Sequence, residues 1–562
     1  MVVSIQKISR FFAFVDRKKG IIMITGAEAM VKCLEAEGIT KIFGYPGVAI
    51  APFYEGLYNS SIEHILVRQE QAAGHAASGY ARVSRKPAVC VTTSGPGATN
   101  LITALATAYA DSIPVVAITG QVSSDLLGKD VFQEADMTGA TESFTKYRYL
   151  VKDVNDIPRI FKEAFYIANT GRKGPVLIDV PIDVQEAKLK KDFKYPDSVE
   201  IRGYKPNTKG NKQQLSKVIQ AIKRAKKPII CTGGGVILGN GEDHIRRFCE
   251  KFNIPCVSTM MGIGVLPKAH PLYFGMLGNN GKPYANRAIA LSDLMIIVGA
   301  RIADRTVPTP DKLESQVKII HIDIDTAEIG KNLGPTLPLV GDVKNIFDEL
   351  IKEDIQPKAQ SWIDELNEIK HSTVDTRVFS DKLVNPNILV QKLAEKMDDD
   401  AIYVADVGQN QLWSADNYVM KKGRFLTTGG MGTMGYSIPA GMGAKMYAPD
   451  KQVVCVIGDG AFQMSMNELA TIKDHSVPLK ILIIKNRYLG LVREYQDKTY
   501  EGHHSGVELF DYPHYDKIAE AYDMPYFHAG TTDELDKVLD GFLKCSEACL
   551  MVCDVDSKDN SK

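Results

Sequence analysis

The chain alternates short apolar runs with longer segments of helical periodicity. Apolar runs such as KIFGY (41–45), AVCVTT (88–93), PIICT (228–232) and VVCVI (453–457) predict strands, and amphipathic or alanine-rich segments follow them. Strands that alternate with helices form βαβ units, and therefore a parallel sheet covered by helices on both faces. The pattern predicts an α/β protein built from doubly wound parallel sheets.

Polar stretches divide this pattern into parts. Residues 186–212 and 351–384 are rich in Lys, Asp, Glu and Asn and predict linkers, which leaves domains at 23–185, 213–350 and 385–562. The length of 562 residues suggests about three to four domains at ~150 residues each. Residues 1–22 look unlike the rest, so we expect a disordered leader, with Met23 as a candidate translation start.

Two segments of the chain repeat one another. KPAVCVTTSGPGATNLITALATAYADSIPVVAIT begins at Lys86, and KQVVCVIGDGAFQMSMNELATIKDHSVPLKILII begins at Lys451. Both predict a strand, a glycine turn, a helix, a D-S-[IV]-P turn (with His475 inserted in the second) and a strand. We therefore expect the first and third domains to be copies of one unit. Each copy places its glycine turn at the carboxyl end of a strand, where doubly wound sheets bind ligands.

Composition and charge exclude some function classes. The formal net charge of −1 gives no reason to expect a nucleic-acid partner, and no apolar stretch approaches the ~20 residues that span a bilayer. The nine cysteines are scattered through apolar runs, which is typical of buried reduced thiols in a cytoplasmic protein. Cys545, Cys549 and Cys553 fall four apart but lack a His or a second Cys pair, so they favour packing over metal binding.

The strongest chemical signal is Gly458-Asp459-Gly460 after VVCVI, with Asn486 after LKILIIK. The carboxyl ends of consecutive parallel strands meet at one edge of a sheet, so Asp459 and Asn486 should converge. Mg²⁺ takes few protein oxygens and completes its octahedron with phosphate oxygens and water. Glycines and the following helix suit a diphosphate. A GDG turn alone is common, but its position one strand before Asn486 favours a metal–diphosphate site over ordinary turns.

These residues resemble the cofactor motif of thiamine-diphosphate enzymes, whose Asp, Asn and a backbone carbonyl, here at Tyr488, hold Mg²⁺. RQEQAAGHAASGYAR (68–82) resembles the helix that carries the family's catalytic Glu, here Glu70. In that family the Glu bonds a pyrimidine nitrogen and drives the aminopyrimidine toward the imino tautomer that removes the thiazolium proton. From the residues alone, Glu70 could equally be a first-turn carboxylate that stabilises the helix dipole.

The resemblance assigns further residues to the cofactor. TTGGMGTMGYSIPAGMGA (427–444) is similar to the loop whose carbonyl at Gly432 meets the amino group and whose Met434 props the cofactor into its bent shape. Core filling is the alternative for Met434. The family divides each site between two subunits, which implies a homodimer at minimum, or a tetramer. The implied cofactor-binding residues are Gly47, Gly408, Gln409, Gly432, Met434, Gly458, Gly460 and Ala461.

Over about 23–555 the chain is most similar to the large catalytic subunits of acetohydroxyacid (acetolactate) synthases, through stretches such as TSGPGATNL (93–101), VFQEADMTG (131–139) and GPVLIDVP (174–181). The resemblance implies condensation of pyruvate with a second 2-oxo acid, pyruvate or 2-oxobutyrate, in branched-chain amino acid biosynthesis. Gln133 and Phe132 would line the pocket and Arg305 would bind the second carboxylate by bidentate pairing. A surface ion pair is the alternative for Arg305. A small regulatory subunit is a further implied partner.

The resemblance also implies FAD in the middle domain. From the residues alone, this is a nucleotide-binding type of unit, and its GGGVILG does not fit GxGxxG, so hydride chemistry is unsupported. We expect a thiamine-diphosphate-binding fold in the first and third domains and an FAD-binding-like fold between them. The implied FAD-binding residues are Gly233, Gly234, Met276, Gly299, Arg301, Asp323 and Asp342.

Several positions depart from the family pattern and keep alternatives open. Val48 stands where a second Gly is usual, and Tyr495 where a Trp favours 2-oxobutyrate; the family's proline-containing C-terminal tail is not recognisable. Ile182, Asn410 and Lys485 replace a usual Lys, His and Asn. The alternatives are an oxidase or simple decarboxylase on the same machinery, or a cofactor-binding paralogue without turnover.

Overall fold

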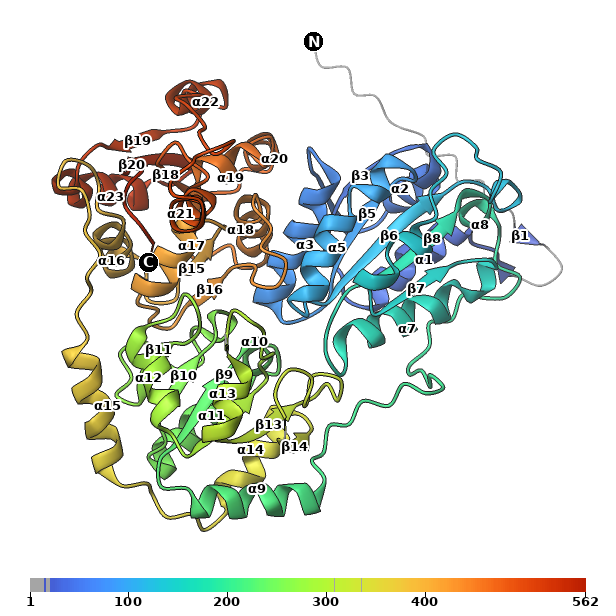
Figure 1. Cartoon of the computed structure of the whole chain (residues 1–562). Coiled ribbons are helices and arrows are strands. Elements are labelled where there is room, and N and C mark those ends of the chain that lie inside the picture. The colour runs from blue at the N-terminus through green and yellow to red at the C-terminus, as the bar shows by residue number, and fades with distance from the viewer. Residues whose placement is uncertain (1–14, 17–20, 308, 335, 562) are drawn as a thin grey trace.

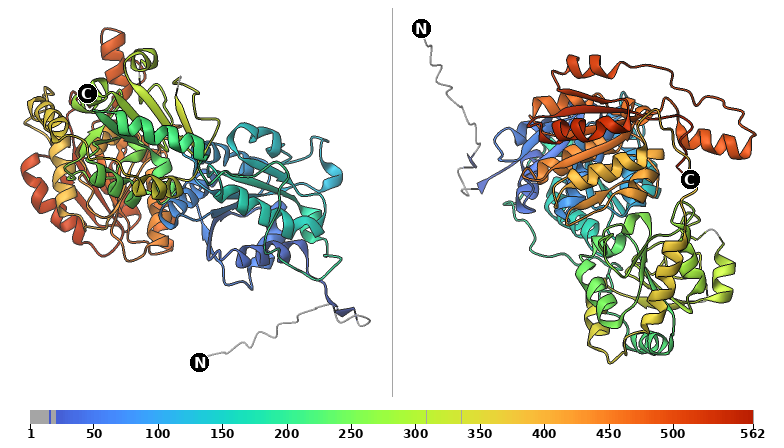
Figure 2. Two further views of the ribbon diagram at one scale, coloured as in Figure 1. Left: turned by 90° about the horizontal axis from the view of Figure 1, so that it is seen from below. Right: turned by 90° about the vertical axis from the view of Figure 1, so that its left-hand side faces the viewer.

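The computed structural model describes residues 15–16, 21–307, 309–334 and 336–561. The predicted leader 1–22 lies outside the described residues except for the short antiparallel strands β1 (Val15–Asp16) and β2 (Ile21–Ile22). The first and third domains lie side by side, and the middle domain lies to one side of both (Figures 1 and 2). In the part of the chain described, no helix is long and apolar enough to cross a membrane.

The first and third domains each contain a six-stranded sheet in which all paired strands are parallel. The orders are β4-β3-β5-β6-β8-β7 and β16-β15-β17-β18-β20-β19. Numbered within each domain, both orders read 2-1-3-4-6-5, which confirms that the two domains share one fold. The strands are β3 (Lys41–Tyr45), β4 (Glu63–Leu66), β5 (Ala88–Thr92), β6 (Val115–Gln121), β7 (Tyr147–Leu150), β8 (Val176–Pro181), β15 (Ile402–Ala405), β16 (Arg424–Leu426), β17 (Val453–Gly458), β18 (Lys480–Lys485), β19 (Tyr526–Ala529) and β20 (Cys549–Asp554).

The middle domain has a different strand order, β11-β10-β9-β12-β13-β14. Within the domain this reads 3-2-1-4-5-6, the order of dinucleotide-binding sheets, which bind their ligand where the order reverses. Here the reversal falls between β9 and β12. The predicted class of three doubly wound α/β domains is therefore confirmed. The strands are β9 (Pro228–Thr232), β10 (Cys256–Ser258), β11 (Tyr273–Met276), β12 (Leu294–Val298), β13 (Lys318–Asp323) and β14 (Leu337–Val340).

Helices cover both faces of each sheet, which is why strands such as β5 and β12 are buried along their whole length. Thr25 caps the first helix as its sequence predicts, with Glu28 completing a capping box. The first domain has α1 (Gly26–Ala36), α2 (Ala51–Leu57), α3 (Glu70–Ser84), α4 (Pro96–Thr99), α5 (Ile102–Ala110), α6 (Met137–Ala140), α7 (Ile157–Asn169) and α8 (Ile182–Glu186). The middle domain has α9 (Lys212–Arg224), α10 (Gly234–Leu238), α11 (Glu242–Phe252), α12 (Pro283–Leu291), α13 (Pro310–Gln316) and α14 (Val343–Lys352). The third domain has α16 (Pro386–Lys396), α17 (Gln409–Asn417), α18 (Ser437–Tyr447), α19 (Asp459–Gln463), α20 (Glu468–Asp474), α21 (Gly490–Thr499), α22 (Tyr515–Ala521) and α23 (Leu535–Lys544).

The segment 351–384 contains a helix, α15 (Gln360–Ser372). Its buried residues Trp362, Ile363 and Leu366 pack into the core of the middle domain, and the Trp362 indole donates to the carbonyl of Pro228 at 3.0 Å. Apolar residues at positions i, i+1 and i+4 fall on one helical face, which explains why this polar stretch folds onto the domain.

The first and third domains meet along α3 and α18, the helices that follow the second strand of each copy. A Cβ placed on Gly79 would lie 1.9 Å from the carbonyl oxygen of Ala440, and one on Gly443 would lie 2.0 Å from that of Ala76. Gly79 follows Ala76 by three residues, and Gly443 follows Ala440 by three. The two copies therefore contribute equivalent small residues to one close helix pair.

Candidate active site

Asp459 and Asn486 lie together at the carboxyl edge of the third sheet. Asp459 begins α19 directly after β17, and Asn486 follows β18, the neighbouring strand. The Asp459 carboxylate accepts the N–H of Arg487 at 2.6 Å and that of Gly460 at 3.0 Å. The Asn486 amide oxygen accepts the N–H of Tyr488 at 3.0 Å. Two loops from adjacent strands thus present oxygen ligands at one point.

This donor set fits Mg²⁺. Asp459 is only 4% exposed, and burial raises the pKa of its carboxyl to about 6 although the N–H groups of Arg487 and Gly460 lower it. A cation would stabilise the charged form. Among the described residues no group of three His, Cys, Asp or Glu side chains could hold a metal. One carboxylate, one amide oxygen and a backbone carbonyl leave room for the phosphate and water oxygens that Mg²⁺ prefers.

The predicted diphosphate loop, at Gly408 and Gln409, contacts Asn486. Gly408 precedes α17 with φ +144°, a conformation that L side chains rarely adopt. The Gln409 amide oxygen accepts the side-chain N–H of Asn486 at 2.6 Å. The Gln409 amide nitrogen donates to Glu494 and to the carbonyl of Asp559, the latter at 3.0 Å. Sequence reasoning did not identify Glu494 or Asp559, because neither lies in a recognisable motif.

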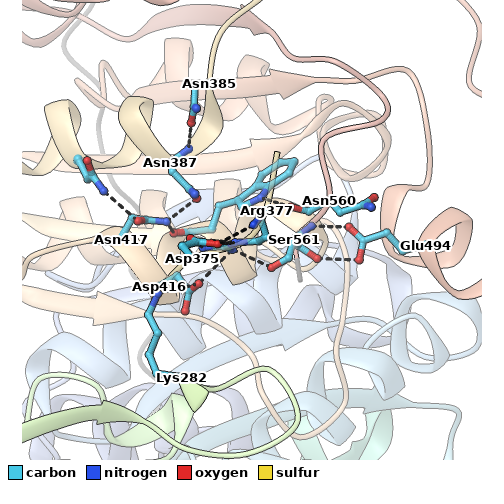
Figure 3. Close-up of polar contacts among 12 residues, drawn as sticks. Lys282, Asp375, Arg377, Asn385, Asn387, Asp416, Asn417, Glu494, Asn560 and Ser561 are labelled. Atoms are coloured by element: carbon cyan, nitrogen blue, oxygen red, sulfur yellow. Dashed lines mark hydrogen bonds and ion pairs between the residues drawn. The ribbon is translucent and has the colours of Figure 1, made fainter. Parts of the chain in front are cut away.

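A polar network joins this loop to the segment before α16 and to the middle domain (Figure 3). The side chain and N–H of Ser561 donate to Glu494 at 2.9 and 2.6 Å, and its carbonyl accepts from Arg377 at 3.0 Å. Arg377 also pairs at 3.2 Å with Asp416, which pairs with Lys282 at 3.1 Å. Asp416 lies on α17, so the helix that begins at Gln409 is held from both neighbouring parts of the chain.

The loop that carries Gly432 and Met434 closes on the same edge. Gly432 has φ +66°, and the Met434 methyl group lies 3.6 Å from a Cβ placed on Gly460. The fully buried carboxylate of Asp406 accepts the N–H groups of Gly435 and Ser437 at 2.9 and 2.7 Å, which fixes the end of the loop. Burial raises the pKa of Asp406 to about 6. The position of Asp406 directly after the strand β15 was the sequence signal that could have identified it.

A second group of predicted residues gathers in the first domain. The Glu70 carboxylate begins α3 and accepts the side-chain N–H of Asn100 at 2.9 Å. A Cβ on Gly97 would lie 3.5 Å from Glu70, and one on Gly95 would lie 2.9 Å from the Cβ of Gln133. The SGPG turn therefore connects Glu70 to Gln133. Gly47 lies beside Thr93 at the start of the same turn, with its Cβ position 2.5 Å from the Thr93 side chain.

A large cavity opens at the switch point of the middle sheet and extends to the other two domains, where Arg172 of the first and Gly432 of the third also line it. Its volume is about 1110 Å³, and six of the seven predicted FAD-binding residues line it. The seventh, Gly233, explains the shape of the switch point: its Cβ position lies 2.3 Å from the carbonyl of Gly299, which itself has φ +54°. Burial raises the pKa of Asp323 to about 6. The lining residues in question are Gly234, Met276, Gly299, Arg301, Asp323 and Asp342.

Comparison with known proteins settles the family. Residues 24–140, 215–350 and 406–553 match the N-terminal TPP binding domain, the central domain and the C-terminal TPP binding domain of thiamine pyrophosphate enzymes. The chain is 43% identical over 538 residues to the probable acetolactate synthase large subunit of Methanocaldococcus jannaschii, covering 94% of this chain and 91% of that protein. It is 40% identical over 524 residues to the acetolactate synthase large subunit of Haemophilus influenzae, covering 92% and 91%. The chain belongs to the acetolactate synthase large-subunit family.

Membership of this family makes the protein a thiamine-diphosphate-dependent enzyme of the carboligase type. A further member, the acetolactate synthase large subunit of Corynebacterium glutamicum, is 44% identical over 496 residues, covering 86% of this chain and 79% of that protein.

The structure places the remaining predicted residues less closely. Arg305 lines the same cavity as Gly432 of the predicted cofactor loop, and its guanidinium lies 3.8 Å from Asp304 in a side chain that is 75% exposed. Val48 and Phe132 are 78% and 87% exposed, and Tyr495 also faces solvent beside Tyr500. Val48 therefore fits without a clash in one chain. Large apolar side chains exposed near Gly47, Gln133 and α21 are typical of surfaces that another chain covers.

Proposed function

We propose that the protein synthesises acetolactate from two molecules of pyruvate, or acetohydroxybutyrate from pyruvate and 2-oxobutyrate, in branched-chain amino acid biosynthesis. The convergence of Asp459, Asn486 and Gln409 at one edge of the third sheet carries the proposal. The names of relatives that align along most of the chain support it. The sequence resemblance to condensing enzymes around 131–139 supports condensation over oxidation.

The residues divide the work as follows. Asp459, Asn486 and the carbonyl of Tyr488 would hold Mg²⁺, with Gln409 and the start of α17 against the diphosphate. Thiamine diphosphate, when bound, supplies the nucleophilic carbon and the electron sink for loss of CO₂. Met434 supports the shape of the site, and its apolar surroundings exclude water, which favours a step that neutralises charge.

Glu70 would hold and move the proton at the pyrimidine nitrogen. Its carboxylate is the acidic group at the start of α3, beside the SGPG turn. Gln133 would orient the second 2-oxo acid, and Arg305 would pair with its carboxylate. Both roles are specificity functions for the acceptor, so their loss should change which product forms before it stops decarboxylation.

The site requires a second copy of the chain. We propose a homodimer at minimum, with a tetramer as a larger assembly, in which Glu70 of one copy faces Asp459 of the other. The exposed Val48, Phe132 and Tyr495 would lie at this interface. The relatives are named large subunits, which supports a small regulatory subunit as an additional partner.

We further propose that FAD occupies the middle-domain cavity at the β9–β12 switch point. At about 1110 Å³ the cavity is larger than the ~300–1,000 Å³ usual for ligand sites, which suits a dinucleotide. Asp323 is the last residue of β13, and Asp342 directly precedes α14. Such positions commonly bind ribose hydroxyls and phosphates. The nine free cysteines, eight of them buried, support a cytoplasmic location.

Product analysis tests the proposal directly. The purified protein is incubated with pyruvate, Mg²⁺, thiamine diphosphate and FAD, and acetolactate is measured as acetoin after acid treatment. Asp459→Ala, which removes a metal ligand, is the negative control. Acetaldehyde, or acetate with oxygen uptake, in place of acetolactate would refute condensation and leave the cofactor assignment standing. Full cofactor binding with no turnover would instead indicate a paralogue that has lost catalysis.

A further inference from the structure

One face of α20 in the third domain contacts the chain just before Glu70 in the first. Glu468 accepts the backbone N–H of Arg68 at 2.9 Å. The hydroxyl oxygen of Thr471, one turn later, lies 3.4 Å from the carbonyl oxygen of Leu66, and Asp474 pairs with the Arg68 guanidinium. Three side chains spaced by three residues therefore hold the turn between β4 and α3, and Glu70 is the first residue after that turn.

Of these three side chains, Glu468 is the one whose burial costs the most free energy. Its side chain is fully buried, and its second carboxylate oxygen accepts the hydroxyl of Thr471 at 2.7 Å. A carboxylate is withdrawn from water only at a large free-energy cost unless hydrogen bonds compensate. Burial raises the pKa of Glu468, and the compensating hydrogen bonds that lower it come first from the Thr471 hydroxyl and then from the backbone N–H groups of Arg68 and Gln69. The buried carboxylate of Glu468 therefore fixes the conformation of the turn between β4 and α3.

The other copy of the fold makes the reciprocal contact. Asp111, at the end of α5 in the first domain, accepts the N–H groups of Gly429 and Gly430 at 3.3 and 2.8 Å. Thr107, one turn earlier, lies 2.7 Å from Thr433, hydroxyl to hydroxyl. These contacts hold the loop that leads to Met434. In each domain the longer helix after the third strand, α5 or α20, thus contacts the segment just before the helix that follows the second strand of the other domain, α18 or α3.

We propose that Glu468 is a positioning residue for Glu70. It holds the turn at Arg68 and Gln69, and through it the place of the Glu70 carboxylate. The inference rests on the proposed function, in which Glu70 acts on a cofactor bound by the second copy. It follows that Glu468 serves the active site that its own Glu70 completes, and not the metal site of its own domain.

Single substitutions give the first test. Glu468→Leu removes the acceptor, Glu468→Gln keeps one acceptor oxygen, and Asp474→Asn removes only the surface ion pair, which contributes little. The specific readout is the rate at which the bound cofactor exchanges its reactive C–H with deuterium, because that is the step Glu70 drives. Cofactor affinity, measured on the same samples, reports whether the third domain is intact.

We expect Glu468→Leu to slow this exchange by ~100-fold, since a 1 Å misplacement of a catalytic group costs about that much. Glu468→Gln should slow it by no more than ~10-fold, the equivalent of one weakened hydrogen bond. Asp474→Asn should stay within about twofold. An unchanged exchange rate in Glu468→Leu, or a loss that appears equally in cofactor affinity, would overturn the proposal.

Mixed dimers carrying two affinity tags separate the two domains that Glu468 could serve. In the first dimer, one chain carries Asp459→Ala and the other carries Glu468→Leu. Its one intact active site combines Asp459 of the Glu468→Leu chain with Glu70 of the Asp459→Ala chain, and that Glu70 is held by an unchanged Glu468. In the second, both substitutions lie on one chain and its partner is wild type, so the surviving site uses the Glu70 that has lost Glu468. We expect about half of wild-type turnover in the first and ~100-fold less in the second.

The reverse order would show that Glu468 acts on the metal site of its own domain. Equal activities would show that Glu468 does not serve the Glu70 of its own chain preferentially, and either result would refute the positioning role. A Glu70→Gln chain paired with an Asp459→Ala chain controls for the shared site, because only intersubunit sites restore half of the activity. No activity in that control would refute the intersubunit part of the proposed function. The role of Glu468 would then be decided by the exchange rates of the homodimeric variants.

Discussion

Replacing Gly79 with Ala tests the close packing of α3 on α18. The new Cβ would lie 1.9 Å from the carbonyl oxygen and 2.6 Å from the Cα of Ala440. Optimal contacts of a carbon atom are roughly 3.5–4.0 Å, so the helices must separate by more than ~1 Å. The obstacle is backbone, which no side-chain rotation can relieve.

The magnitude follows from two opposing effects. Overpacking of a core costs about 1–3 kcal/mol, and an obstacle made of backbone places this change at the upper end. Alanine is a better helix former than glycine by up to ~1 kcal/mol. We therefore expect a net destabilisation of ~2 kcal/mol. Because α3 begins at Glu70, the shift should also lower turnover by ~10- to 100-fold.

The assay compares acetolactate formation and the half-life of activity on heating. A half-life is used because a chain of three domains is not expected to unfold in a single reversible step. Gly541→Ala in α23 is the matched control, since its Cβ would approach only the Phe527 ring, at 3.0 Å. Wild-type turnover and half-life in Gly79→Ala, with the control unchanged, would refute the close approach of the two helices.

Three further predictions follow from buried groups and glycines. Burial lowers the pKa of His75 to about 3. Between pH ~6.5 and ~3 the unfolded chain therefore takes up a proton that the folded chain does not. The free energy of unfolding then falls by ~1.4 kcal/mol per pH unit on acidification. His75→Gln should lessen the shortening of the half-life of activity on heating between pH 7 and pH 4; an unchanged shortening would refute it. Glu70→Gln should fold and bind cofactor while turnover falls by several orders of magnitude, and near-normal turnover would remove Glu70 from the mechanism. Gly233→Ala, whose Cβ would lie 2.3 Å from the Gly299 carbonyl, should release flavin on gel filtration while helix content by circular dichroism is retained; full retention of flavin would place the flavin away from the Gly233 switch point.

The periodicity and the internal repeat predicted the three sheets and the kinship of the first and third. Strand order is harder to obtain from one sequence, because periodicity reveals which residues are buried but not which strand lies beside which. The glycine turns still placed Asp459 and Asn486 correctly at one edge, since both follow strands that are neighbours in the sheet. Local patterns were sufficient wherever the chemistry lies at the end of a strand.

Contacts between distant parts of the chain could not be predicted. Glu468 and Arg68 are 400 residues apart, and nothing in MNELATI indicates that its carboxylate is buried against another domain. The Gln409 contacts with Asn486 and Asp559 are of the same kind. Such pairings depend on how folded domains pack against one another. A single sequence shows which residue types are present but not which distant residues come into contact.

The small-residue seam between α3 and α18 has a consequence for protein engineering. A chimera that took its first domain from a relative would have to bring the matching third domain with it, because Gly79 lies against the backbone of Ala440 and Gly443 against that of Ala76. The middle domain lies outside this seam and, together with α15, is the natural unit of exchange. Recombination libraries built from this family should therefore place their crossovers between α8 and α9 and between α15 and α16.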